Sequence, residues 1–301
     1  MPCVITHRTR AAMALSKLSA DEHGIIIGQL CNTLEPRLAW YFSSANSGLR
    51  VLLTPALRLQ LKADHEAAAT LCHKMGTSCK ELREARAVDW IDKRLSAADL
   101  ATLGTLGSVL PTLEELAIGE PRGTAGPDGV QRLMAGLGAG ALPATTFLGF
   151  NFMHMGDAGA SAFAAALGRG ALPRLTTLAL MHAAIGDAAL VALAPALRRL
   201  PTLESLYLID NVFGDEGLAA LLAPPPPAGA LPLPTGGLKK LKALSFEGTQ
   251  VSDAGCAALA TALESSALPA LEGLTLIGIP ASAAAKQAVR AALARSRAAS
   301  S

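Results

Sequence analysis

The 301-residue chain has few aromatic residues, which make up 4% of it, and few charged residues, which make up 17%. Its 26 Lys and Arg are nearly balanced by 24 Asp and Glu, and no basic block is long enough to bind nucleic acid through its phosphates. Hydrophobic residues account for 51% of the chain, which excludes intrinsic disorder and supports a large core. We therefore expect a globular protein without a nucleic-acid partner.

Cysteine is also scarce, with five residues at Cys3, Cys31, Cys72, Cys79 and Cys256. An odd number without paired spacing does not fit the disulfide scaffold of a secreted protein, and it favours a reducing compartment, the cytoplasm or the nucleus. The two long uncharged runs, 133–156 and 217–238, are interrupted by glycine and proline, so neither predicts a membrane-spanning helix. No membrane partner is expected.

The clearest feature of the sequence is a recurring template, L-P-x-L-x-x-L-x-L. Its copies begin at Leu110, Leu142, Leu172, Leu200, Leu238 and Leu268. Successive starts are separated by between 28 residues (Leu172 to Leu200) and 38 residues (Leu200 to Leu238), and the longest interval contains a proline-rich insertion at 223–237. A degenerate earlier copy, CKELREARA, is expected to begin at Cys79. The sequence thus predicts about seven units over 79–301.

Each copy is followed by signals that predict a helix. An aspartate stands fifteen residues after four of the starts, at Asp157, Asp187, Asp215 and Asp253. We expect these aspartates to be helix N-caps, and a glycine two residues later in three units would let the helix lie close to the next turn. A short strand and a capped helix cannot bury their apolar faces alone, so the units should stack into a solenoid with a parallel concave sheet and outer helices.

These units resemble the leucine-rich repeats of the ribonuclease-inhibitor-like subfamily, whose long units alternate strand and helix in a horseshoe. The resemblance implies an α/β fold and a non-enzymatic interaction platform. The family's asparagine after the strand is present at Asn211, but Met153, Ala183 and Thr249 take the equivalent places, so its ladder of buried amides should be mostly missing. Ribonuclease inhibition is not expected, because the strand faces carry too little acidic charge.

Alternate strand residues should point away from the helices, toward the concave side. In the first unit these would be Glu84 and Arg86. In the middle of the sheet they predict an exposed apolar patch that anchors a protein partner, with polar residues at its rim. The predicted partner-binding residues are Phe147, Asn151, Met181, His182, Tyr207, Ile209 and Asp210. The alternative is that one or two of them turn inward at irregular strands.

Motifs for catalysis and metal binding are sparse. Asp64-His65-Glu66 lacks the second histidine that a zinc protease needs, and Cys72, His73 and Cys79 lack a fourth ligand at zinc-site spacing. His154 and His182 follow two successive strands, and we expect them to be neighbours on the rim. We expect no catalytic residues, no metal and no cofactor.

Residues 1–78 lack the template and predict a small helical region. The order LSADEHGIIIGQL and LEPRLAWYFSSANSGLRVLL resembles a degenerate F-box, the module that joins substrate receptors to a cullin-RING ubiquitin ligase. On that resemblance, a ubiquitin-ligase adaptor would bind Leu18, Ile26, Leu30, Leu34 and Pro36. The alternative is a hydrophobic cap on the first repeat. A third hypothesis, again by resemblance, is a GTPase-activating protein for Ran.

Overall fold

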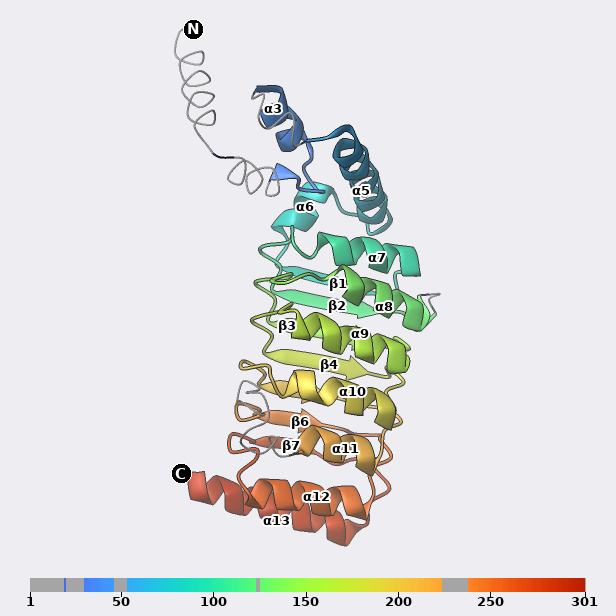
Figure 1. Cartoon of the computed structure of the whole chain (residues 1–301). Coiled ribbons are helices and arrows are strands. Elements are labelled where there is room, and N and C mark those ends of the chain that lie inside the picture. Colours follow the sequence, from blue (N-terminus) through green and yellow to red (C-terminus); the bar gives the residue numbers. More distant parts are fainter. Residues whose placement is uncertain (1–18, 20–29, 46–52, 123–124, 224–237, 301) are drawn as a thin grey trace. The chain divides into compact units, whose positions relative to one another are not determined.

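The computed structural model describes residues 19, 30–45, 53–122, 125–223 and 238–300 (Figure 1). The chain divides into two compact units, Met1–Arg83 and Glu84–Ser301. Most of the predicted insertion, 224–237, lies outside the described residues. Among the helices that are described, none combines the length and the apolar character needed to cross a bilayer.

The first unit is helical in its described part, with helices α3 (Arg37–Ala45), α5 (Pro55–Lys74) and α6 (Cys79–Glu84). Helix α5 begins where the side chain of Thr54 accepts a hydrogen bond from the Leu57 amide and Pro55 occupies the first turn. A small buried cluster of Ala39, Leu53 and Leu61 forms the interior, and Leu30 and Leu57 pack against it.

The second unit is an open sheet of seven parallel strands in sequence order, with a helix after each strand. The strands are β1 (Ala87–Ile91), β2 (Glu115–Gly119), β3 (Phe147–Asn151), β4 (Thr177–Met181), β5 (Ser205–Tyr207), β6 (Ala243–Ser245) and β7 (Gly273–Thr275). The helices are α7 (Ala97–Leu106), α8 (Gly126–Gly136), α9 (Gly156–Gly168), α10 (Asp187–Leu197), α11 (Asp215–Leu222), α12 (Asp253–Glu264) and α13 (Ala283–Ser300). The predicted α/β solenoid is confirmed.

The helices stack on one side of the sheet (Figure 1). The register places equal template positions side by side, so that Leu116, Leu148 and Leu178 form a buried row. Residues of this row face the helices, and burying one leucine side chain stabilises the fold by about 2 kcal/mol. The residues between them point to the opposite side of the sheet, which we call the open face.

The first strand–helix repeat of the solenoid differs from the prediction. The segment Cys79–Glu84 is helix α6, and β1 pairs Ala87 with Glu115. The expected strand residues Glu84 and Arg86 therefore precede the sheet.

The template of this unit begins at Leu82 rather than at Cys79, with Val88 and Trp90 in the later leucine positions. Both side chains are buried, and Trp90 is 5% exposed. As a consequence, Asp89 stands on the open face in the place assigned to Arg86.

The sequence predicted that the repeated aspartates cap their own helices, which is wrong: Asp187, Asp215 and Asp253 bind the start of the next unit instead. Asp187 Oδ1 accepts hydrogen bonds from the Gly214 and Gly217 amides at 2.8 and 2.7 Å. Asp187 itself is the first residue of α10, whose N-cap is Gly186. A carboxylate near a helix N-terminus is favourable in either unit, because the first amides of a helix lack partners within it.

Asp215 repeats this arrangement one unit later. Its Oδ1 accepts the Ser252 and Gly255 amides at 2.8 and 2.9 Å, and its Oδ2 accepts the Ser252 hydroxyl at 2.5 Å. Burial raises the pKa of Asp215, but the hydrogen bonds from Ser252 and Gly255 outweigh this effect and hold the pKa below its ordinary value. Asp253 continues the series with one bond, from the Ser282 amide.

The glycines after the aspartates leave room for the preceding unit's carboxylate. A Cβ on Gly255 would lie 2.3 Å from Asp215 Oδ1, and a Cβ on Gly217 would lie 2.8 Å from Asp187 Oδ1. The glycines thus allow a close approach, but to the carboxylate of the preceding unit and not, as the sequence predicted, to the next turn.

Asn211 is the one asparagine of the amide ladder, as the sequence predicts. Its Oδ1 accepts the Ala183 and Ile185 amides, and its Nδ2 donates to the carbonyls of Leu180 and Leu208. The equivalent positions are buried without such an amide, at Met153, Ala183 and Thr249.

Candidate partner-binding face

The predicted patch lies on the open face, where four apolar side chains remain partly exposed. They are Phe147, Met181, Tyr207 and Ile209. Backbone hydrogen bonds continue the ladder past the end of β5, since the Leu208 amide donates to the Ser245 carbonyl at 2.7 Å. This continuation keeps Ile209 on the same face as Tyr207.

Small residues lie between the larger ones in the central row of the open face. The register places Ala117, Gly149, Ala179 and Tyr207 side by side. A Cβ on Gly149 would lie 3.1 Å from Cε1 of Phe147, so the phenyl ring lies over this glycine. The two rings of the patch are thus separated by side chains no larger than a methyl group.

The predicted rim residues differ in how far their side chains are exposed. His182 and Asp210 are exposed, and His182 Nε2 lies 3.2 Å from Asp210 Oδ2. Asn151 pairs with Met181 in the register but is only 9% exposed.

A residue absent from the sequence prediction, Phe152, completes this rim. Its ring stacks on the His182 imidazole with the centroids 4.4 Å apart and the planes 9° apart. The side chain of Phe152 is 43% exposed. Phe152, His182 and Asp210 form a row of three side chains, which we call the rim row, and all three have positive φ.

The rim row was recognisable from spacing. Each member stands ten residues after its repeat start, at Leu142, Leu172 and Leu200. The expectation that His154 neighbours His182 was wrong, because the pairing of Asn151 with Met181 places Phe152 beside His182. His154 lies two residues farther along the chain and is exposed.

Two buried polar atoms on the open face lack hydrogen-bond partners among the described residues, Asn151 Oδ1 and Ser245 Oγ. Ser245 is 5% exposed and pairs with Tyr207 in the register. An unsatisfied buried polar atom costs about 1–3 kcal/mol, so both atoms would gain from a hydrogen bond to a bound molecule.

The predicted adaptor-binding residues are only partly described. Leu18 and Ile26 lie outside the described residues, while Leu34 and Pro36 are buried and Leu30 is partly buried.

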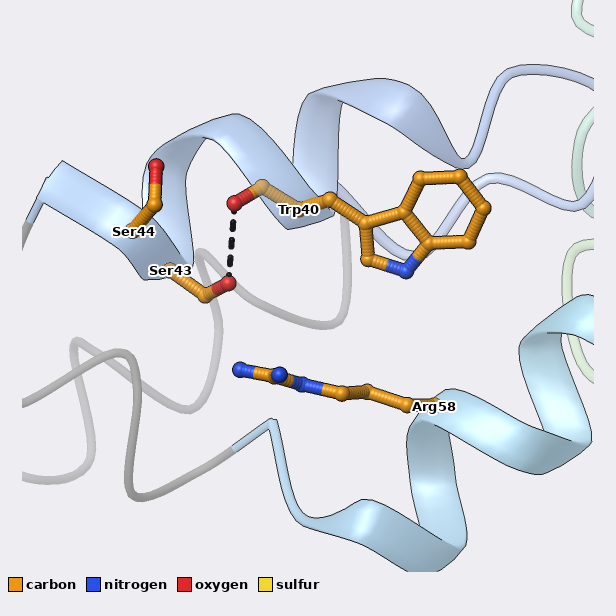
Figure 2. A pocket seen from close by; sticks show the side chains of 4 residues that line it. All are labelled: Trp40, Ser43, Ser44 and Arg58. Carbon is orange, nitrogen blue, oxygen red and sulfur yellow. Dashed lines mark hydrogen bonds between the residues drawn. The ribbon is translucent and has the colours of Figure 1, made fainter.

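A cavity of about 440 Å³ lies in the first unit, lined by Trp40, Ser43, Ser44 and Arg58. In Figure 2 the Arg58 side chain reaches toward Ser43, whose hydroxyl donates to the Trp40 carbonyl at 3.0 Å. Arg58 Nε donates to the Leu53 carbonyl at 3.1 Å. The cavity therefore offers one guanidinium and an indole, a combination that can attract an anion.

The cysteines of the first unit do not form a metal site in the described structure. Burial, with a further contribution from the neighbouring Cys79, raises the pKa of Cys72 to about 12. Cys72 is therefore a neutral thiol at physiological pH. Within the described ranges, no three His, Cys, Asp or Glu side chains are grouped so that they could hold a metal ion.

The leucine-rich repeat family model matches residues 172–194 and 199–222. No curated protein matches the sequence. Among solved structures, the chain is similar to actin-binding site 2 of leiomodin-1, with 19% identity over 48% of this chain and 75% of that one, and a TM-score of 0.36. It is also similar to the mouse RP105/MD-1 complex, with 16% identity over 64% of this chain and 29% of that one, and a TM-score of 0.31. The family model thus covers two consecutive units of a chain whose seven parallel strands, each followed by a helix, form one α/β solenoid.

Proposed function

We propose that this protein is a non-enzymatic scaffold that binds a protein partner on the open face of its repeat sheet. The observation that supports this most strongly is the group of partly exposed apolar side chains, Phe147, Met181, Tyr207 and Ile209, beside the exposed stack of the rim row. The long strand–helix units also favour the ribonuclease-inhibitor-like subfamily.

The energetics of such a surface favour a few anchoring residues. Aromatic side chains bury much area and lose little conformational entropy, so Tyr207 and Phe147 are expected to contribute most of the binding energy. The stacked ring of Phe152 is held in place before binding, which lowers the entropy cost of using it. The small residues between the rings let a partner's side chain approach the backbone of the sheet.

The test uses capture of partners from an extract of the source cells, followed by affinity measurement with the purified partner. Tyr207→Ala should weaken binding by about tenfold or more, the range expected for an aromatic anchor. Val191→Ala is the matched control, because Val191 is 39% exposed but lies on helix α10. Equal affinities of both variants for the same partner would contradict the proposal.

The hypotheses of a ubiquitin-ligase receptor and of a Ran GTPase-activating protein stay predictions from the sequence. The compartment, cytoplasm or nucleus, also stays a prediction.

A further inference from the structure

We propose that the partner segment bound by the open face is a cationic stretch of polypeptide, with basic residues on both sides of an apolar centre. This inference rests on the proposed function and names the chemistry of its partner.

The open face carries acidic residues on both sides of its apolar patch. Asp89 and Glu115 stand on β1 and β2, and both side chains are exposed. Beyond the patch, Asp210 and Glu247 follow β5 and β6, and the Asp210 amide donates to the Glu247 carbonyl at 2.7 Å. The sheet therefore presents acid, apolar and acid zones in strand order.

The described strands contain no Lys or Arg, although Lys93 and Arg94 follow β1. The one partly basic group is His182, which faces Asp210. Within the described part of the chain, no ion pair neutralises Asp89, Glu115 or Glu247. The whole chain has a formal charge of +2, so its cations lie elsewhere, and the negative charge is a property of the face.

The negative charge of this face was underestimated from the sequence, because the strand of the first repeat was placed three residues too early. The prediction placed Glu84 and Arg86 there, whose charges cancel. The structure replaces them with Ala87 and Asp89. The pair of positions therefore changes from neutral to one negative charge.

The unsatisfied polar atoms are an independent sign that a ligand binds here. Asn151 is 9% exposed and Ser245 is 5% exposed, and each has a buried oxygen without a partner among the described residues. Both stand at positions whose side chains point to the open face. Donors such as backbone amides or the side chains of Lys and Arg would satisfy them.

The sheet geometry sets the spacing of the partner's charges. Neighbouring strands lie about 4.8 Å apart, and Glu247 stands four residues beyond Ala243, which is in register with Glu115, so the diagonal from Glu115 on β2 to Glu247 after β6 spans roughly 23 Å. An extended chain rises about 3.3 Å per residue, so about seven residues separate the two basic groups. The residues between them would lie over Phe147, Met181 and Tyr207.

The probe is a fluorescently labelled peptide of about twelve residues, with Arg and Lys at both ends and Leu and Phe in the centre. Two matched peptides replace every basic residue with Ser or with Glu. Fluorescence anisotropy with the full chain should show binding of the basic peptide at least about tenfold tighter than of either control. Raising the salt from about 50 to about 300 mM should weaken it, since screening shortens the reach of these charges.

The variant that tests the site is Glu115→Lys combined with Glu247→Lys. Among the described residues neither carboxylate makes a hydrogen bond whose loss would destabilise the fold, and circular dichroism checks the fold. The double variant should weaken the basic peptide by about tenfold or more. The control, Glu216→Lys, reverses an exposed acid on helix α11 and should change the affinity by less than about twofold.

The proposal is overturned if the basic peptide does not bind, if the serine or glutamate peptide binds equally well, or if charge reversal has no effect. A protein partner that depends on Tyr207 but not on Glu115 and Glu247 would overturn the cationic segment and leave the proposed function intact. A partner lost on charge reversal but unaffected by Tyr207→Ala would contradict the apolar anchor. Self-association that charge reversal abolishes would identify a second copy as the occupant and overturn the proposal.

Discussion

Asp215→Ala should destabilise the repeat unit by removing the contact between neighbouring units. The carboxylate accepts three hydrogen bonds, two from amides and one from the Ser252 hydroxyl. A helix N-cap contributes about 0.5–2 kcal/mol, and hydrogen bonds to a charged group contribute about 1.5–3 kcal/mol each when well buried. Because Asp215 is half-buried, we expect a total loss of about 2–3 kcal/mol in the free energy of unfolding.

Urea denaturation followed by circular dichroism measures this loss, and the chain offers a graded series. Asp187 accepts two bonds from the next unit and Asp253 accepts one, so alanine at these positions should cost less, in that order. Asp157 is the matched control, because it has the same place in its unit but no such bond in the described structure. Its replacement removes only the interaction with its own helix, about 0.5 kcal/mol.

The pH dependence gives a second readout with a definite sign. The pKa of Asp215 is lowered in the folded protein from its ordinary value of 3.8. Its contribution to stability is therefore fully present above that value and is lost as the pH falls through the folded pKa. The difference between wild type and Asp215→Ala should shrink in that acidic range. Equal destabilisation by Asp157→Ala and Asp215→Ala would refute the reasoning, since the carboxylates would then act on their own helices.

Three further predictions concern single positions. Gly255→Ala should destabilise by about 1–3 kcal/mol, because its Cβ would lie 2.3 Å from Asp215 Oδ1, whereas Gly168→Ala, with open space around it, should stabilise by about 0.5 kcal/mol; thermal melts measure both. Asn211→Ala should lower the unfolding free energy by about 3 kcal/mol, because it leaves two buried amides unsatisfied, and chemical denaturation would show it. Cys72 should resist iodoacetamide at pH 8 in the folded protein and react after urea treatment, as mass spectrometry can show, because its pKa is about 12.

The repeat period was enough to predict the solenoid, because the leucines that face the helices recur at fixed positions. The first repeat was misplaced because it matches the template poorly, with Ala85 and Trp90 in place of leucines. Several alignments of such a segment satisfy the apolar pattern. Only the pairing of Ala87 with Glu115 decides among them.

The partner of a repeated side chain is harder to predict than its position. The sequence shows that Asp187 and Asp215 recur before helices, but both a cap on the same helix and a bond to the next unit fit that spacing. The hydrogen bonds of both carboxylates to amides of the next unit decide between the two. Phe152, by contrast, was within reach of the sequence, because it occupies the same place in its unit as His182 and Asp210.

The most direct test of the central claim places a photoreactive amino acid at a single position and identifies crosslinked proteins in a cell extract. The two positions are Tyr207, on the open face, and Val191, on helix α10. We predict that light produces a discrete crosslinked protein from position 207 and none from position 191. The same adducts from both positions, or adducts from position 191 alone, would contradict the claim that partners bind the open face.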